Sequence, residues 1–211
     1  MDGDQNGGIG DLQQFTVSQL ADAFGDSVPV ETAIRPLDSQ FRICGSALTV
    51  ECTPGDNLTL HHALHLARAG DALVVTGSAN ADAALWGELM SISAHLKGLA
   101  GTIVDGAVRD ILEIRDIGYP VFSRHVTPRR AAKATYGKIN VPVRIGLITV
   151  KPGDLIVADA NGIVSIPRQK LDEAVQRGQR IANEESSIKS EILAGRTTFE
   201  ILNLQPYVNE S

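Results

Sequence analysis

The chain of 211 residues is poor in cysteine and in aromatic residues, and it has no large excess of charge. Its two cysteines, Cys44 and Cys52, match no metal-binding spacing, so we expect buried, reduced thiols and a cytoplasmic location. Aromatic residues make up 4% and the net charge is −6, which predicts no base-stacking surface and no basic stripe for nucleic acid. No apolar run reaches transmembrane length, and the acidic, glycine-rich start is unlike a signal peptide. We therefore expect neither a nucleic-acid nor a membrane partner.

The length predicts a single domain over residues 1–211, with residues 1–11 as a flexible lead-in and 205–211 as a tail. Helical and strand periodicities alternate in the first half, and short strands follow one another in the second half. Thr16 and Asn57 are predicted N-caps. The pattern predicts a mixed α/β fold with a mixed central sheet and flanking helices. The expected strands are 41–52, 72–76, 102–104, 119–123, 139–143, 147–150, 155–158 and 163–166, and the expected helices are 16–24, 57–68, 87–97, 111–117, 169–193 and 197–204.

The stretch from Gly87 to Asp110 combines a helix, a glycine turn and the buried strand 102–104, followed by a turn at 105–106. It ends on Arg109–Asp110, at the carboxyl end of that strand, where open α/β sheets bind ligands. Arginine presents a planar fork to a carboxylate or keto oxygen, and aspartate is a hard oxygen ligand for Mg²⁺. Free N–H groups in the helical turn that begins at Gly87 can hold a carboxylate. These features predict a site for a small anionic ligand.

Each of these features also has a structural explanation. Most Arg-Asp dipeptides are solvated ion pairs, and Glu88 favours a helix N-terminus by its charge alone. His61 and His65 share a helix face as zinc ligands do in H-E-x-x-H, but His62 occupies the glutamate position, so a metal site there is disfavoured. Because the chain has no nucleophile motif, no covalent mechanism is predicted.

Five stretches carry a family resemblance: A-L-W-G-E-L-M, G-L-A-G-T-I-V-D-G-A-V-R-D, G-Y-P-V-F-S-R, N-V-P-V and K-P-G-D-L-I-V-A-D-A-N-G-I-V-S-I-P. They resemble the RraA-like family, over nearly the whole chain from about Thr16 to Leu204. The most specific feature of the resemblance is an acidic residue followed, after twenty intervening residues, by Arg-Asp. Glu88 and Arg109–Asp110 match this spacing. This family includes class II pyruvate aldolases that cleave 4-hydroxy-4-methyl-2-oxoglutarate and 4-carboxy-4-hydroxy-2-oxoadipate. It also includes regulators of ribonuclease E.

The resemblance implies a β/β/α swivelling-type fold and homotrimers or hexamers (dimers of trimers) with active sites between subunits. It implies a metal-dependent aldolase that cleaves a 4-hydroxy-2-oxo dicarboxylic or tricarboxylic acid to pyruvate and a second oxo acid. Oxaloacetate decarboxylation is an expected side activity, and the expected metal is Mg²⁺, with Mn²⁺ as the second candidate. The alternative is a non-catalytic regulator that acts on a ribonuclease by protein–protein binding. The presence of Asp110, a metal carboxylate that a regulator need not keep, favours the enzyme.

The same resemblance assigns roles to individual residues. Arg109 would contact the keto or enolate oxygen, and Glu88 would order a catalytic water with it. Asp110 would anchor the metal, largely through waters. Glu88 departs from the aspartate of aldolase members, and residues 144–148 depart from their Gly-Gly-Val pattern. The implied substrate-binding set at the pyruvoyl end is Gly87, Glu88, Leu89, Met90 and Arg109, with the amides around Leu89 and Met90 on the substrate carboxylate.

Overall fold

The computed structural model describes residues 8–25, 30–77 and 83–208. Ten strands form the main sheet in the order β1–β12–β11–β3–β4–β6–β7–β2, with β5 paired to β6 and β8 to β3. The hairpin of β9 and β10 is separate from this sheet. The strands are β1 Val30–Glu31, β2 Arg35–Pro36, β3 Ile43–Glu51, β4 Asp71–Thr76, β5 Ala84–Trp86, β6 Gly101–Val108, β7 Val121–Val126, β8 Lys138–Ile139, β9 Val143–Ile145, β10 Ile148–Val150, β11 Leu155–Asp159 and β12 Gly162–Ile166.

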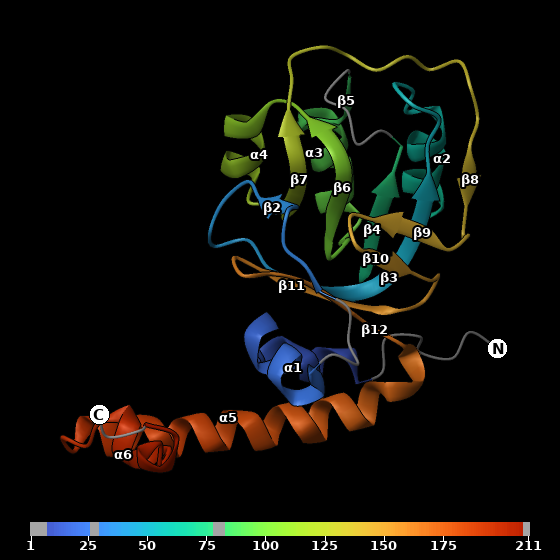
Figure 1. Cartoon of the computed structure of the whole chain (residues 1–211). Helices are drawn as coiled ribbons and strands as arrows, with labels where there is room; N and C mark the ends of the chain where they lie inside the picture. Colours follow the sequence, from blue (N-terminus) through green and yellow to red (C-terminus); the bar gives the residue numbers. More distant parts are fainter. Residues whose placement is uncertain (1–7, 26–29, 78–82, 209–211) are drawn as a thin grey trace.

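Strands β3, β4, β6 and β7 run parallel to one another in the middle of the sheet. Parallel neighbours need crossover connections, and helices α2, α3 and α4 supply them. Strand β6 is buried along its whole length, as expected for a parallel strand that is covered on both faces. The carboxyl ends of these strands therefore meet at one edge of the sheet (Figure 1). The helices are η1 Ile9–Gln14, α1 Val17–Phe24, α2 Leu58–Leu66, α3 Glu88–Leu96, α4 Ile111–Ile117, η3 Arg168–Lys170, α5 Leu171–Leu193, α6 Thr198–Ile201 and η4 Gln205–Tyr207.

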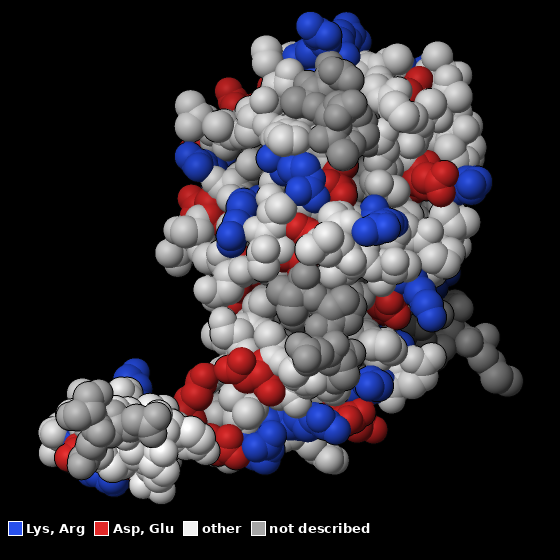
Figure 2. Space-filling model, in the orientation of Figure 1, with Lys and Arg blue, Asp and Glu red and all other residues white. Residues whose placement is uncertain are grey.

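The other half of the molecule is antiparallel and has its own apolar cluster. Strands β11 and β12 pack on η1, α1 and the first half of α5, and α5 then runs beyond the body of the protein (Figure 1). Lysines, arginines and carboxylates are interspersed on the face shown in Figure 2, without a continuous stripe of either sign. Among the helices in the described ranges, none combines the length and apolarity needed to cross a membrane.

The predicted mixed α/β fold with flanking helices is confirmed, and so is the N-cap at Thr16, which forms a capping box with Gln19. The turn predicted at 105–106 is wrong, because both residues lie within β6 at an irregularity in its pairing with β7. Residues Ala84–Trp86, for which no strand was predicted, form strand β5. Within the expected lead-in, Ile9 is buried at the start of η1. Parts of the predictions that fall on residues 1–7, 78–82 and 209–211 lie outside the described residues.

Candidate functional site

The site is formed where the carboxyl end of β6 meets the first turn of α3. The backbone N–H of Arg109 donates to the carbonyl of Trp86 at 3.0 Å, which joins the residue after β6 to the residue before Gly87. The Glu88 N–H donates to Asp110 Oδ2 at 3.1 Å, and Arg109 Nε lies 3.4 Å from the same oxygen. The carboxylate therefore joins both halves of the stretch that the sequence singled out.

Asp110 has an unusual backbone conformation. It is the N-cap residue of α4, with φ 59° and ψ 45° in the left-handed region that side-chain-bearing residues seldom occupy. Aspartate at this position commonly caps its own helix, but here the side chain makes no capping bond and reaches α3 instead. Strained backbone of this kind is concentrated at functional sites.

Gly87 allows the two segments to approach closely. A Cβ atom there would lie 2.6 Å from Asp110 Oδ2 and 3.1 Å from Arg109 Cγ. Its φ of −165° is ordinary extended backbone, so the glycine is required by space and not by conformation. The glycine thus lets the Arg109–Asp110 pair lie directly against the start of α3.

All six residues predicted for the site line one cavity of about 200 Å³. That volume is below the range typical of drug-sized ligands and suits a small metabolite. Arg109 and Asp110 are partly exposed, with 41% and 34% of their side-chain surface accessible. The structure therefore brings the predicted set together, while the role of each residue stays a prediction. The cavity is lined by Asn57, His61, Ala84, Trp86, Gly87, Glu88, Leu89, Met90, Arg109, Asp110, Arg130, Ala131 and Lys133.

The opposite wall of this cavity was not predicted. It is made by Asn57 and His61 at the start of α2, and by Arg130 and Lys133 from the segment between β7 and β8, which arches over the end of the sheet (Figure 1). From the sequence, the basic run 124–133 is more often solvated surface than a second carboxylate site, and one subunit's arginine could reach another subunit's pocket. No local pattern could have placed it, because its position depends on bonds to Asp56, which lies 78 and 79 positions before the two donors.

Asp56 holds the basic loop against α2. Its Oδ2 accepts the N–H groups of Ala134 at 2.7 Å and Thr135 at 2.9 Å, and its Oδ1 accepts that of Leu58 at 2.9 Å. Burial raises the pKa of this carboxyl, but the three amide bonds and the charge of Lys133 outweigh burial and leave the pKa below its ordinary value of 3.8. The carboxylate is therefore ionised at neutral pH and fixes the backbone that carries the loop cations.

The carboxylates of the site suit a hard cation bound mainly through water. Asp110 and Glu88 are the two acidic side chains lining the cavity, and nowhere in the described ranges do three His, Cys, Asp or Glu side chains form a metal-binding group. Mg²⁺ accepts one or two protein carboxylates and keeps several waters, whereas a structural zinc site needs four ligands. His62, which lies between the two histidines of the disfavoured site on α2, has its Nδ1 2.6 Å from the hydroxyl of Tyr136.

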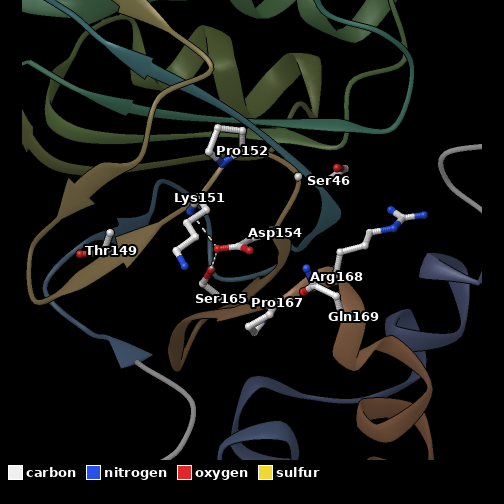
Figure 3. A pocket seen from close by; sticks show the side chains of 10 residues that line it. Ser46, Thr149, Lys151, Pro152, Asp154, Ser165, Pro167, Arg168 and Gln169 are labelled. Atoms are coloured by element: carbon white, nitrogen blue, oxygen red, sulfur yellow. Dashed lines mark hydrogen bonds between the residues drawn. The ribbon is translucent and has the colours of Figure 1, made fainter.

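A larger cavity of about 440 Å³ lies near Ser46, which pairs with the first residue of β4 and so marks the opposite edge of the parallel strands. Its carboxylate, Asp154, already accepts the Lys151 N–H at 2.8 Å and the Ser165 hydroxyl at 3.3 Å. Figure 3 shows the side chain of Arg168 extending away from Asp154. Because ligands of such sheets gather at the carboxyl edge, the smaller cavity is the better candidate.

Comparison with known proteins finds relatives by sequence and by structure. The chain is 34% identical over 196 residues to the protein MJ0644 of Methanocaldococcus jannaschii, covering 92% of this chain and 93% of that one. It is 29% identical over 150 residues to the 4-hydroxy-4-methyl-2-oxoglutarate aldolase of Thermus thermophilus, covering 71% and 91%. The crystal structure of RraAS2 from Streptomyces coelicolor, described as an unusual member of the RNase ES inhibitor RraA protein family, matches with a TM-score of 0.77, 27% identity and coverage of 90% and 97%. The model of the RraA-like family (Aldolase/RraA) matches residues 17–165, and the chain belongs to that family.

Proposed function

We propose that the protein is a divalent-metal-dependent lyase that cleaves a 4-hydroxy-2-oxo dicarboxylic or tricarboxylic acid to pyruvate and a second oxo acid. The observation that carries this proposal is the convergence of the first turn of α3, Glu88, Arg109 and Asp110 on one small cavity. The aldolase name of the Thermus relative supports the same reaction class.

The first turn of α3 suits the carboxylate of the substrate. The first amides of a helix have no partner within it, so the N–H groups of Leu89 and Met90 are available to an anion at the positive end of the helix. Arg109 lines the same cavity, so its guanidinium can donate a hydrogen bond to the adjacent keto oxygen of the substrate. This pairing orients a 2-oxo acid with its carbonyl toward Arg109.

Cleavage starts when the water held between Glu88 and Arg109 accepts the proton of the 4-hydroxyl, whose oxygen becomes the carbonyl oxygen of the second oxo acid. The C3–C4 bond breaks, and its electron pair moves onto the keto group to give the enolate of pyruvate. Arg109 stabilises the negative oxygen by hydrogen bonding. A water held between Glu88 and Arg109 returns a proton to C3 and completes pyruvate. Asp110, with Glu88 beside it, would hold Mg²⁺, and the bound ion would act as a Lewis acid that stabilises the negative charge on the enolate oxygen.

Oxaloacetate provides the simplest assay, because its decarboxylation passes through the same enolate. We expect pyruvate release that EDTA abolishes and Mg²⁺ restores. Arg109→Ala and Asp110→Ala should abolish turnover while circular dichroism and the unfolding midpoint stay close to wild type. Undiminished, metal-dependent pyruvate release by both variants would overturn the assignment.

We also propose a homotrimer or hexamer with the site near a subunit contact. Leu89 and Leu96 on α3 have 76% and 80% of their surface exposed, although they are large and apolar. Exposed apolar faces of this kind are typical of protein contacts. Since Leu89 also lines the cavity, a neighbouring subunit packed there would shield its mouth from water. Light scattering that gives the mass of a monomer would refute this arrangement.

The same apolar face suits the alternative, a non-catalytic regulator that binds a ribonuclease. The Streptomyces structure is described as a member of an RNase inhibitor family, which supports considering it. Absence of pyruvate release from several 2-oxo acids, together with direct binding to a ribonuclease, would favour this function over the lyase.

A further inference from the structure

Ser91 is a fully buried polar residue on α3 that the reaction proposed above leaves without a role. It does not line the cavity of the site, so it cannot touch the substrate directly. A serine inside a helix often donates its hydroxyl to the carbonyl four residues earlier, and Ser91 Oγ donates to the Gly87 carbonyl at 3.1 Å. Because Gly87 is the residue packed against Asp110, this bond connects the interior of the protein to the site.

The two side-chain partners of Ser91 fix the direction of its hydroxyl proton. The indole Nε1 of Trp86 lies 2.7 Å from Ser91 Oγ, and an indole N–H can only donate. A backbone carbonyl can only accept, so the hydroxyl proton points to Gly87. The indole is itself buried and stacked on Tyr119, with the ring centroids 6.2 Å apart. These groups therefore form a hydrogen-bond chain of one polarity, from Trp86 through Ser91 to Gly87.

The chain continues through a single peptide group. The Gly87 carbonyl and the Glu88 N–H belong to the same planar peptide unit, so fixing the direction of one also fixes the other. The carbonyl accepts the hydroxyl and the backbone N–H of Ser91, both at 3.1 Å. On the opposite side of the peptide, the Glu88 N–H donates to Asp110 Oδ2 at 3.1 Å. Ser91 therefore sets the direction of the N–H that holds the carboxylate.

Asp110 uses only one of its carboxylate oxygens for these contacts. Its Oδ2 accepts the Glu88 N–H and lies 3.4 Å from Arg109 Nε, whereas no donor in the described parts of the chain is bonded to Oδ1. An oxygen without a protein donor is available to a hard cation and its waters. Since hydrogen bonds in a chain polarise one another, the two donors on the Gly87 carbonyl strengthen the bond from the Glu88 N–H.

We propose that Ser91 is a positioning residue for the divalent metal, because its hydroxyl orients the Gly87–Glu88 peptide that holds Asp110 with one oxygen left for the ion. Trp86 acts through Ser91 by fixing the direction of the hydroxyl. This inference rests on the metal-dependent function proposed above and identifies buried residues that control its metal affinity. Removal of such outer partners of metal ligands typically lowers metal affinity about 10- to 100-fold.

Mn²⁺ binding, followed by electron paramagnetic resonance of the free ion, tests the proposal without relying on catalysis. Ser91→Ala should raise the dissociation constant of Mn²⁺ at least about tenfold. The matched control is Ser93→Ala, which removes an exposed hydroxyl from the same helix and should bind Mn²⁺ like the wild type. Asp110→Ala should abolish binding, which shows that the titration reports this site. Wild-type affinity in Ser91→Ala, or an equal loss in Ser93→Ala, would refute the proposal.

The Mg²⁺ dependence of pyruvate release from oxaloacetate gives a second readout. In Ser91→Ala the Mg²⁺ concentration for half-maximal rate should rise by the same factor as the Mn²⁺ dissociation constant, and saturating Mg²⁺ should restore most of kcat. A lower kcat with an unchanged Mg²⁺ requirement would show that Ser91 supports the fold and does not position the metal ligand.

Ser91→Thr separates the effect of the hydroxyl from that of side-chain packing. A threonine hydroxyl in a helix also bonds to a carbonyl in the preceding turn, so this variant should keep the Mn²⁺ dissociation constant within about twofold of wild type. Its additional methyl overpacks a buried position and should lower the urea unfolding midpoint. A loss of Mn²⁺ affinity as large as in Ser91→Ala would refute the role of the hydroxyl.

The role of Trp86 is tested by combining substitutions. Trp86→Phe removes the N–H donor and should weaken Mn²⁺ binding about threefold, less than Ser91→Ala, because the Ser91 hydroxyl still reaches the Gly87 carbonyl. When Ser91→Ala is already present, Trp86→Phe should have no further effect, since the group through which it acts is gone. An equal effect of Trp86→Phe with and without Ser91→Ala would show that Trp86 acts by packing alone and would refute the chain.

The same measurements separate this inference from the function on which it rests. If the wild type binds Mn²⁺ and releases pyruvate from oxaloacetate, unchanged Mn²⁺ binding in Ser91→Ala refutes the role of Ser91 alone. If the wild type binds Mn²⁺ but releases no pyruvate from any 2-oxo acid, the lyase proposal fails, while weaker binding in Ser91→Ala still supports the role of Ser91. If the wild type binds no divalent ion, both proposals fail.

Discussion

Replacing Gly87 by alanine tests the geometry of the site without removing any charged group. The glycine has an extended φ of −165°, which alanine also adopts, so the change introduces no backbone strain. The added methyl carbon would lie 2.6 Å from Asp110 Oδ2. Since nonbonded atoms attract at about 3.5–4.0 Å, the carboxylate must move by roughly 1 Å.

That movement lengthens the 3.1 Å bond from the Glu88 N–H and displaces the group we assign to the metal. A hydrogen bond to a charged group contributes about 1.5–3 kcal/mol, and a misplacement of about 1 Å in a catalytic site lowers the rate about 100-fold. We therefore expect Gly87→Ala to lower kcat/KM for oxaloacetate decarboxylation about 100-fold. The folded state should lose only about 1–3 kcal/mol, the usual cost of overpacking.

The assay measures pyruvate release over a range of Mg²⁺ concentrations, and urea unfolding reports stability. Gly10→Ala is the matched control, because a Cβ there meets no atom within 4 Å. Wild-type kcat/KM and wild-type Mg²⁺ dependence in Gly87→Ala would refute the argument that the close contact with Asp110 supports catalysis. A loss of similar size in Gly10→Ala would show that the effect is not specific to the site.

Three other substitutions test the frame around the site. Asp56→Asn should lower the free energy of unfolding at pH 7, measured by urea unfolding. Because folding lowers the pKa of Asp56, the difference in this free energy between wild type and variant should be complete above the ordinary pKa of 3.8. It should shrink as the pH falls toward the pKa of the folded state. Gly137→Ala brings a Cβ against the Glu51 carbonyl and should lower the unfolding free energy by at least about 1–3 kcal/mol, which the same urea titration measures. Trp86→Phe removes the 2.7 Å bond from the indole N–H to Ser91 Oγ and should cost about 1 kcal/mol by thermal unfolding; no change in midpoint would contradict this assignment.

The half of the site built by one continuous stretch could be predicted from the sequence. An apolar strand followed by Arg109–Asp110 indicates the carboxyl end of a parallel strand, and the acidic start of α3 indicates a helix N-terminus. These are local signals, and only twenty residues separate Glu88 from Arg109. The sequence did not predict the left-handed conformation of Asp110 or its bond to the Glu88 N–H, because both depend on how α3 packs beside β6.

The other half of the site depends on contacts between distant segments. Asn57 was correctly placed at a helix start, but its side chain was expected to cap that helix, and its bond to Leu85 depends on the packing of β5. Lys133 belongs to a basic run that is more often solvated surface than a second carboxylate site. Asp56 brings that run to α2 by accepting hydrogen bonds from backbone N–H groups, which every non-proline residue has. Because such bonds do not depend on the type of side chain, a local sequence pattern identifies the wall that carries the family motif and misses the opposite wall, which α2 and the segment between β7 and β8 form.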